Sequence, residues 1–292
     1  MNLHVSGRRF NLTDLGCATD EKPPRTVHSL MKIGATTMTV LYPTGNRLQG
    51  KVALVTGGAR GMGESHSRAM VAQGAKVVIA DILDAEGEAL AKELGDAAIY
   101  VHLDVTNRDQ WTEVVATTLK QFGKLNVLVN NAGIANFGAI GEFTTDQWDL
   151  VIAINLTGVF NGINASVNAL KASAPSSIIN ISSTAGLQGY TRLPGYNAAK
   201  FGVRGLTKSV ALDLGPDNVR CNSVHPGAIV TPMTAGLVGA QKHVALQRMG
   251  RSEELSHLIV FLASDESSFS TGAEFIADGG ETAGLAAGVL NL

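Results

Sequence analysis

From residue 51 onward, short apolar runs alternate with longer stretches of helical character, and this alternation constrains the fold more than any other feature of the chain. The strand-like runs are residues 52–55, 76–81, 99–104, 125–130, 177–181, 219–224 and 274–276. Helical patterns lie near residues 86–94, 111–122, 145–170, 195–214 and 253–264, and one more follows the first run. Strand–helix repetition implies parallel crossovers, and near-continuous apolar runs are typical of strands buried on both faces. The pattern predicts one α/β domain built on a doubly wound parallel sheet flanked by helices.

Residues 1–48 lack this regularity, and we expect them to form a disordered extension ahead of a domain at residues 49–292. They show no sustained period of 2 or 3.6. Their apolar stretch at 38–42 is shorter than the roughly 7–15 residues of a secretory signal core, and their acidic residues are unlike a transit peptide. A later start at Met31 or Met38 is an alternative, which mass spectrometry of the native N-terminus tests.

Charge and cysteine content narrow the possible functions. Lys and Arg number 23 against 25 Asp and Glu, so no basic excess attracts nucleic acid or an anionic membrane. Cys17 and Cys221 are the only cysteines, and neither they nor His225 and His243 show the spacing of a metal site. The sequence contains no stretch of about 18 consecutive apolar residues, so a membrane span is not expected. We therefore expect a cytoplasmic globular protein without metal, membrane or nucleic-acid partners.

A glycine-rich turn follows the first strand and opens the first helix. Gly57, Gly61 and Gly63 lie in it, together with Arg60 and Met62. Glycine lets the chain turn tightly and lets the backbone approach a diphosphate, while the helix N-terminus offers N–H groups to it. The turn predicts a dinucleotide site, and an ordinary strand–helix turn is the alternative.

Asp81 ends the second strand, 18 residues after Gly63. An acid at this place accepts hydrogen bonds from an adenosine ribose and repels the 2′-phosphate of NADP. Two points leave alternatives open, because Arg60 favours NADP and Asp81 is also a reasonable N-cap for the next helix. On balance the sequence favours NAD.

Tyr196 and Lys200 are four residues apart in a helical stretch, so they share one face. An ammonium close to a tyrosine favours the phenolate and lowers its pKa, which prepares the phenol for proton transfer. Ser183 follows the strand at 177–181, at the end of a parallel sheet that carries ligands, and its hydroxyl could hold the same substrate oxygen. The alternative is that Ser182 and Ser183 are turn residues.

Taken together, these motifs resemble the short-chain dehydrogenase/reductase superfamily over residues 49–285. Asn130-Asn131-Ala132-Gly133, Asn155 and Pro226-Gly227 also match it. The resemblance implies a Rossmann-like domain, usually in a homotetramer, that transfers hydride between a nicotinamide and an alcohol or ketone.

The resemblance also implies residue roles. Tyr196 would be the catalytic acid/base and Ser183 would polarise the substrate oxygen. Lys200 would hold the nicotinamide ribose, and Asn155 would position a water between Lys200 and solvent. The other implied cofactor positions are Asp104 (or an N-cap), Val105, Asn131, Ala132, Gly133, Pro226, Gly227, Ile229 and Thr231.

The substrate signal is weaker than the cofactor signal. Phe137, Gln188, Tyr190, Leu193 and residues 232–238 are the expected pocket and lid, and their apolar character suits a bulky alcohol or ketone. Segments 80–84, 222–227, 231–234 and 270–274 are most similar to bacterial 3α(20β)-hydroxysteroid dehydrogenases. The alternatives are a 3-oxoacyl-(acyl-carrier-protein) reductase, which would want NADPH and a basic docking face, and a sensor that binds the dinucleotide without catalysis.

Overall fold

The computed structural model describes residues 27–33, 36–236 and 241–285. Its main feature is a seven-stranded parallel sheet with the strand order β5-β4-β3-β6-β7-β8-β9. The strands are β3 (Val52–Thr56), β4 (Lys76–Asp81), β5 (Ala98–His102), β6 (Val127–Asn130), β7 (Ser176–Ile181), β8 (Val219–Pro226) and β9 (Glu274–Ala277). The predicted doubly wound parallel sheet is confirmed.

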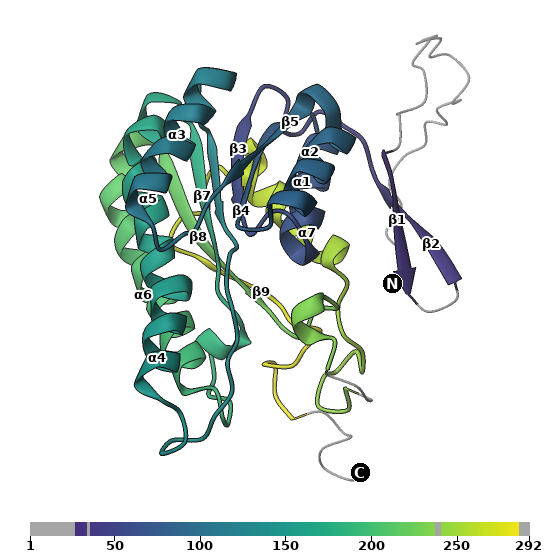
Figure 1. The fold of residues 1–292 in the computed structure, drawn as a ribbon, viewed down its shortest axis with the longest axis vertical. Coiled ribbons are helices and arrows are strands. Elements are labelled where there is room, and N and C mark those ends of the chain that lie inside the picture. Colours follow the sequence, from purple (N-terminus) through teal and green to yellow (C-terminus); the bar gives the residue numbers. More distant parts are fainter. Residues whose placement is uncertain (1–26, 34–35, 237–240, 286–292) are drawn as a thin grey trace, which may run out of the picture.

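Helices cover both faces of this sheet (Figure 1). One layer holds α1 (Gly61–Ala72), α2 (Asp84–Leu94) and α7 (Ser252–Ala263). The other holds α3 (Arg108–Phe122), α4 (Thr145–Ile152), α5 (Gly158–Ala172) and α6 (Pro194–Leu214). Each helical pattern in the sequence matches one of these helices within a few residues at its ends, except that the pattern at 145–170 covers both α4 and α5.

Most strand residues are apolar because both sheet faces are buried, although β8 also buries Arg220, Asn222 and His225. On β3, Ala53 and Val55 belong to the core under α1 and α7, whereas Leu54 belongs to the core under α3, α5 and α6. Successive side chains of a strand point to opposite faces, so one short run supplies two cores. This burial explains why the sequence shows continuous apolar runs in place of alternation.

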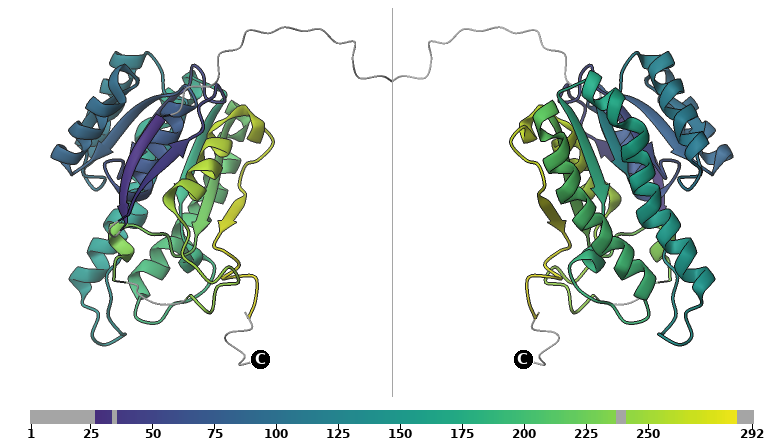
Figure 2. Two further views of the ribbon diagram at one scale, coloured as in Figure 1. Left: turned by 90° about the vertical axis from the view of Figure 1, so that its right-hand side faces the viewer. Right: turned by 90° about the vertical axis from the view of Figure 1, so that its left-hand side faces the viewer.

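The strand order reverses between β3 and β6, because the chain extends the sheet first toward β5 and then toward β9. Ligands of open parallel sheets bind outside the carboxyl ends of the strands at such a reversal. Figure 2 shows that the long loops before α4 and α6 and after β8 gather at one end of the molecule. The topology thus assigns one end of the sheet to the site.

Helix α4, a π-helical segment at Ala153–Thr157 and α5 follow one another without a break. Together, Thr145–Ala172 are long and apolar enough to cross a membrane by length and composition, with a mean hydropathy of 1.5 over the most apolar window. Searching for consecutive apolar residues did not find this segment. Val151, Ile163 and Leu170 are buried in the domain, and 44% of the most apolar window is buried, so packing accounts for part of the apolar composition.

Part of the expected N-terminal extension has regular structure. Strand β1 (Val27–Ile33) pairs with β2 (Thr36–Tyr42) in an antiparallel hairpin, where the sequence pattern predicted no element. Tyr42 is buried and donates a hydrogen bond to Ser65 Oγ on α1 at 3.1 Å, and Leu48 is fully buried. The packed domain therefore includes residues ahead of the expected boundary at 49. The expected disorder of residues 1–26 falls outside the described residues.

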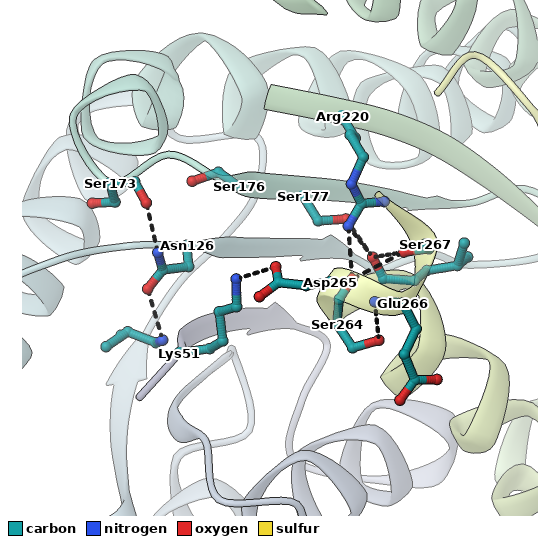
Figure 3. Close-up of polar contacts among 12 residues, drawn as sticks. Lys51, Asn126, Ser173, Ser176, Ser177, Arg220, Ser264, Asp265, Glu266 and Ser267 are labelled. Carbon is teal, nitrogen blue, oxygen red and sulfur yellow. Dashed lines mark hydrogen bonds and ion pairs between the residues drawn. The ribbon is translucent and has the colours of Figure 1, made fainter. Parts of the chain in front are cut away.

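Polar contacts close the amino end of the sheet, opposite the loops (Figure 3). Arg220 points from β8 toward the end of α7 and donates to Leu262 O at 2.9 Å and to Ser264 O at 3.1 Å. Lys51 pairs with Asp265 at 2.6 Å in the same region. Carbonyl groups in the last turn of a helix lack partners inside the helix, so these donors satisfy part of that need.

Candidate active site

The glycine-rich turn after β3 leaves no room for side chains. Gly57 has a φ of +59° and Gly61 a φ of +61°, which L side chains rarely adopt. A Cβ on Gly57 would lie 2.9 Å from Ala132 Cα, and one on Gly63 would lie 2.0 Å from Gly57 O. Arg60 precedes α1 without capping it through its side chain, so N–H groups of the first turn can donate to an anion. The turn fits the diphosphate of a dinucleotide.

Asp81 is fixed beside this turn by backbone donors. Its Oδ2 accepts from Ala59 N at 3.0 Å, and its Oδ1 accepts from Ile82 N at 2.8 Å and Leu83 N at 3.2 Å. The N-cap of α2 is Leu83, so Asp81 is not the helix cap that the sequence left open. Because Arg60 is exposed in the same turn, the structure holds both the acid that favours NAD and the cation that favours NADP.

The segment after β6 locks the turn in place. Thr56 Oγ1 accepts from Asn131 N and Ala132 N, each at 3.0 Å. Asn131 Nδ2 donates to Thr56 O at 2.9 Å and to Gly57 O at 3.1 Å. These bonds join the carboxyl ends of β3 and β6 where the strand order reverses.

Asn155 lies in the π-helical segment and is fully buried. Its Oδ1 accepts from Ile134 N at 2.9 Å, and its Nδ2 donates to Ile134 O at 2.8 Å. A Cβ on Gly133 would lie 3.2 Å from Asn155 Oδ1 and 3.7 Å from Lys200 Nζ, so the three residues are neighbours. Single π turns inside helices often mark functional sites. Here the turn commits the Asn155 side chain to the loop after β6, beside Lys200.

Ser183, Tyr196 and Lys200 converge at the carboxyl end of β7. The Ser183 side chain lies close enough to the Tyr196 phenol to lower its pKa. Lys200 Nζ lies 5.5 Å from the centre of the Tyr196 ring and donates to Ile181 O at 2.8 Å. The i, i+4 spacing on α6 and the end of a neighbouring strand therefore bring a hydroxyl, a phenol and an amine together, as the sequence predicted.

Burial dominates the titration of this trio. Burial raises the pKa of Tyr196 although its side chain is partly exposed, and the nearby Ser183 side chain lowers this pKa by less. Burial lowers the pKa of Lys200 to about 8. The sequence predicted a Tyr196 pKa lowered by Lys200, but in this structure burial raises it and Lys200 is not among the causes of the shift.

Two neighbours hold Ser183 and α6. Ser182 Oγ donates to Lys200 O at 2.9 Å, so this serine ties β7 to α6. His225 is buried, its Nδ1 donates to Ser183 O at 3.0 Å and its Nε2 accepts from Ser223 Oγ at 2.9 Å. His225 is thus a positioning residue, and no sequence spacing indicated this role.

Asp104 and Val105 follow β5. Asp104 Oδ1 accepts from Thr106 N at 2.9 Å and Thr106 Oγ1 at 2.8 Å, whereas the N-cap of α3 is Asn107. The alternative N-cap role of Asp104 is therefore wrong. Val105 is buried, and its carbonyl accepts from Trp111 Nε1 at 2.9 Å.

The segment after β8 returns to the glycine turn. A Cβ on Gly227, which follows Pro226, would lie 2.9 Å from Asp278 Cα. Ile229 is buried, and a Cβ on Gly61 would lie 3.6 Å from Thr231 Cβ. Thr231 therefore contacts the turn that fits the diphosphate.

The expected substrate side contains one residue that sequence reasoning missed. Tyr190 Oη hydrogen-bonds Glu281, lies 2.8 Å from Thr184 Oγ1 and accepts from Gln188 Nε2 at 2.9 Å. Burial and the bond to Glu281 raise the pKa of Tyr190 to about 12. Phe137 is 61% exposed. Residues 237–238 of the expected lid lie outside the described residues. The residue that sequence reasoning missed is Glu281, which gave no local signal because 91 positions separate it from Tyr190.

Outside this site we considered a cavity, a buried cysteine and possible metal ligands, and none of them forms a second reactive centre in the described part of the chain. A cavity of about 550 Å³ lies between β8, β9 and α7, and its lining does not include Ser183, Tyr196 or Lys200. Cys221 is fully buried in the core. Among the described residues, no cluster of His, Cys, Asp and Glu could hold a metal ion.

Comparison with known proteins agrees with this geometry. A sequence model of the family described as enoyl-(acyl carrier protein) reductase matches residues 57–282. A 3-alpha-(or 20-beta)-hydroxysteroid dehydrogenase of Mycobacterium bovis is 59% identical over 240 residues, which are 82% of this chain and 92% of that protein. A trans-4-hydroxycyclohexanecarboxylate dehydrogenase of Sinomonas cyclohexanicum is 53% identical over 82% of this chain and 95% of its own.

A further relative bears on the cofactor. An NADP-dependent (R)-specific alcohol dehydrogenase of Lentilactobacillus kefiri is 41% identical over 82% of this chain and 99% of its own length. At least one relative thus uses NADP, and the named relatives are all oxidoreductases. The family match, the identities and the converging Ser183, Tyr196 and Lys200 lead to one conclusion: the chain belongs to the short-chain dehydrogenase/reductase superfamily of NAD(P)-dependent oxidoreductases.

Proposed function

We propose that the protein is an NAD(H)-dependent dehydrogenase of bulky apolar secondary alcohols, with hydroxysteroids as the substrate class. The convergence of Ser183, Tyr196 and Lys200 beside the glycine turn is the observation that carries this proposal. The 59% identity to a hydroxysteroid dehydrogenase supports the substrate class. The exposed aromatic ring of Phe137 suits a large apolar ligand.

In this mechanism the nicotinamide supplies or accepts the hydride. The Ser183 hydroxyl and the Tyr196 phenol hold the substrate oxygen from two sides. In ketone reduction Tyr196 donates its proton to that oxygen, and in alcohol oxidation Tyr196 takes the proton back. The raised pKa of Tyr196 keeps the phenol protonated at neutral pH, which suits the reductive direction.

The other residues position these groups. Lys200 holds the nicotinamide ribose and restores the proton on Tyr196, with a water near Asn155 leading to solvent. Asp81 binds the adenosine ribose, with Asp104 and Val105 toward the adenine and with Gly57, Gly61, Met62 and Gly63 at the diphosphate. Asn131, Ala132, Gly133, Pro226, Gly227, Ile229 and Thr231 line the rest of the cofactor site.

Asp81 supports the preference for NAD over NADP. Its carboxylate is fixed by three backbone N–H groups, so it cannot turn away from a 2′-phosphate without losing them. Arg60 is exposed and makes no cap, so it can leave the site at little cost.

A 3-oxoacyl-(acyl-carrier-protein) reductase of Thermotoga maritima is 41% identical over 80% of this chain, and this favours a 3-oxoacyl reductase as the second candidate. That enzyme would want NADPH, which Asp81 opposes. A non-catalytic sensor need not keep a proton-transfer trio, so the presence of Ser183, Tyr196 and Lys200 argues against a sensor. We also expect a homotetramer in the cytoplasm, and the exposed Phe269 and Ile276 near β9 support subunit contacts.

The deciding experiment follows the reduced-nicotinamide absorbance with a steroid ketone, a simple cyclic ketone and a 3-oxoacyl thioester. Each is measured with NADH and with NADPH. We expect turnover of the steroid ketone with NADH. Faster turnover of the thioester with NADPH would establish the second candidate, and no turnover with either nucleotide would leave the sensor.

A further inference from the structure

A carboxylate from the C-terminal segment contacts the expected substrate pocket through Tyr190. Tyr190 Oη hydrogen-bonds Glu281 and lies 2.8 Å from Thr184 Oγ1. Thr184 follows Ser183 directly, so one phenol separates the Glu281 carboxylate from the segment that carries the catalytic hydroxyl. Asn197, next to Tyr196, donates its Nδ2 to Tyr190 O at 3.1 Å. Tyr190 is therefore held at both its backbone and its hydroxyl.

The turn that carries Glu281 is itself fixed. The Asp278 carboxylate accepts from Gly280 N at 2.8 Å and from Thr282 N and Oγ1 at 2.8 and 2.6 Å. A Cβ on Gly280, whose φ is +88°, would lie 2.7 Å from Ala245 Cβ. The bonds to Asp278 keep the shape of the turn, and Leu246 N donates to Gly279 O at 3.0 Å, which ties the turn to the neighbouring loop. Glu281 is thus a built part of the site wall.

The charge of Glu281 is poorly balanced. Its side chain is only 7% exposed, and within the described part of the chain its one ion-pair partner is His243, 3.8 Å away and 54% exposed. Lys200 Nζ is engaged with Ile181 O, and Arg192 pairs with Glu142 at 3.5 Å. A carboxylate in such a place acts through protein of low dielectric constant, so its field on a nearby ligand is weakly screened.

We propose that Glu281, held against Tyr190, restricts the enzyme to uncharged cyclic alcohols and ketones and excludes ring substrates that carry a carboxylate. This inference rests on the proposed function. A substrate carboxylate placed beside Glu281 would lose its hydration and face a like charge without an arginine or lysine partner. An uncharged group of the same shape would meet only the hydrogen-bonding Tyr190–Glu281 pair.

The test uses two ketones of nearly equal shape, 4-oxocyclohexanecarboxamide and 4-oxocyclohexanecarboxylate. Their kcat/KM with NADH, and their inhibition of steroid ketone reduction, are measured for the wild type and for Glu281→Gln. We expect the wild type to favour the amide at least tenfold, mainly through KM. Glu281→Gln should raise kcat/KM for the carboxylate about tenfold or more and change that for the amide less than threefold, since a tenfold change corresponds to about 1.4 kcal/mol.

Three further variants separate charge from shape. Glu113→Gln removes an exposed acid on α3 and should leave the amide-to-carboxylate ratio unchanged. Tyr190→Phe keeps the carboxylate and should keep the preference for the amide, whereas Glu281→Ser also removes the carboxylate and carries the test if Glu281→Gln does not fold. Melting temperature and NADH affinity report folding and the cofactor site.

Each outcome decides between the hypotheses. Equal use of the two ring ketones by the wild type, an unchanged ratio in Glu281→Gln, or a preference lost in Tyr190→Phe would overturn the role of Glu281. Those results leave the dehydrogenase proposal standing, provided that the steroid ketone is reduced. If no ketone is reduced with either nucleotide, the proposed function itself is wrong.

Discussion

Replacing Lys200 with methionine should abolish activity and make the protein more stable. Lys200 is 4% exposed, and burial lowers its pKa from the ordinary 10.5 to about 8. At about 1.36 kcal/mol per pH unit, keeping this side chain protonated in the fold costs on the order of 3 kcal/mol at pH 7. Methionine removes that cost but leaves Ile181 O without its donor, which costs about 1 kcal/mol. The expected gain at pH 7 is about 2 kcal/mol.

The pH dependence identifies the cause. A lysine whose folded-state pKa is lowered destabilises the fold fully below the folded pKa and not at all above the unfolded pKa. The advantage of Lys200→Met should therefore shrink as pH rises from 8 toward 10.5, and at pH 9.5 it should be below about 1 kcal/mol. Both proteins share all other titrating groups, so the difference isolates Lys200.

Urea unfolding of the cofactor-free protein at pH 7 and pH 9.5 measures this difference. Lys92→Met, an exposed position on α2, is the matched control and should shift stability by less than about 0.5 kcal/mol. A variant no more stable than the wild type, or an advantage that does not change with pH, would refute the argument that the active-site lysine is held at a cost.

Three further predictions test the cofactor, the chemistry and the fold. Tyr196→Phe should abolish turnover and leave NAD binding, measured by fluorescence titration, within threefold of the wild type; near-normal activity would contradict the acid/base role. Asp81→Ala should narrow or reverse the ratio of kcat/KM for NAD and NADP, and an unchanged ratio would count against the ribose contact. Arg220→Met should lower the unfolding free energy by about 2 kcal/mol, because carbonyl groups at the end of α7 lose their donor; a loss under about 0.5 kcal/mol would show that other groups replace it.

Local signals in the sequence were sufficient for the sheet and for most of the site. Apolar runs with helical stretches between them predicted all seven strands, because buried strands need uniform hydrophobicity whatever their partners are. The Gly57–Gly63 turn and the Tyr196–Lys200 spacing are also local, since each depends on one turn or one helix face. Ser183 was predictable because a strand end in a parallel sheet faces the ligand side.

Local sequence signals did not predict features that depend on contacts with distant segments of the chain. The β1–β2 hairpin has no periodic pattern, and the π turn at Asn155 interrupts what the sequence presents as one helix. Tyr42 is buried because it packs near α1 and donates a hydrogen bond to Ser65 on that helix. The packed part of the chain therefore begins before residue 49, which the sequence pattern did not indicate.

The sequence by itself predicted a parallel α/β sheet, a glycine turn suited to a diphosphate, and Ser183, Tyr196 and Lys200 as candidate proton-transfer residues, because each strand, turn or helix face gives a local signal. Only the tertiary structure decided how these groups titrate and what surrounds them. Desolvation, a property of the assembled core, raises the pKa of Tyr196 and lowers that of Lys200. The contact between Tyr190 and Glu281 likewise exists only once the chain has folded, since 91 positions separate the two residues.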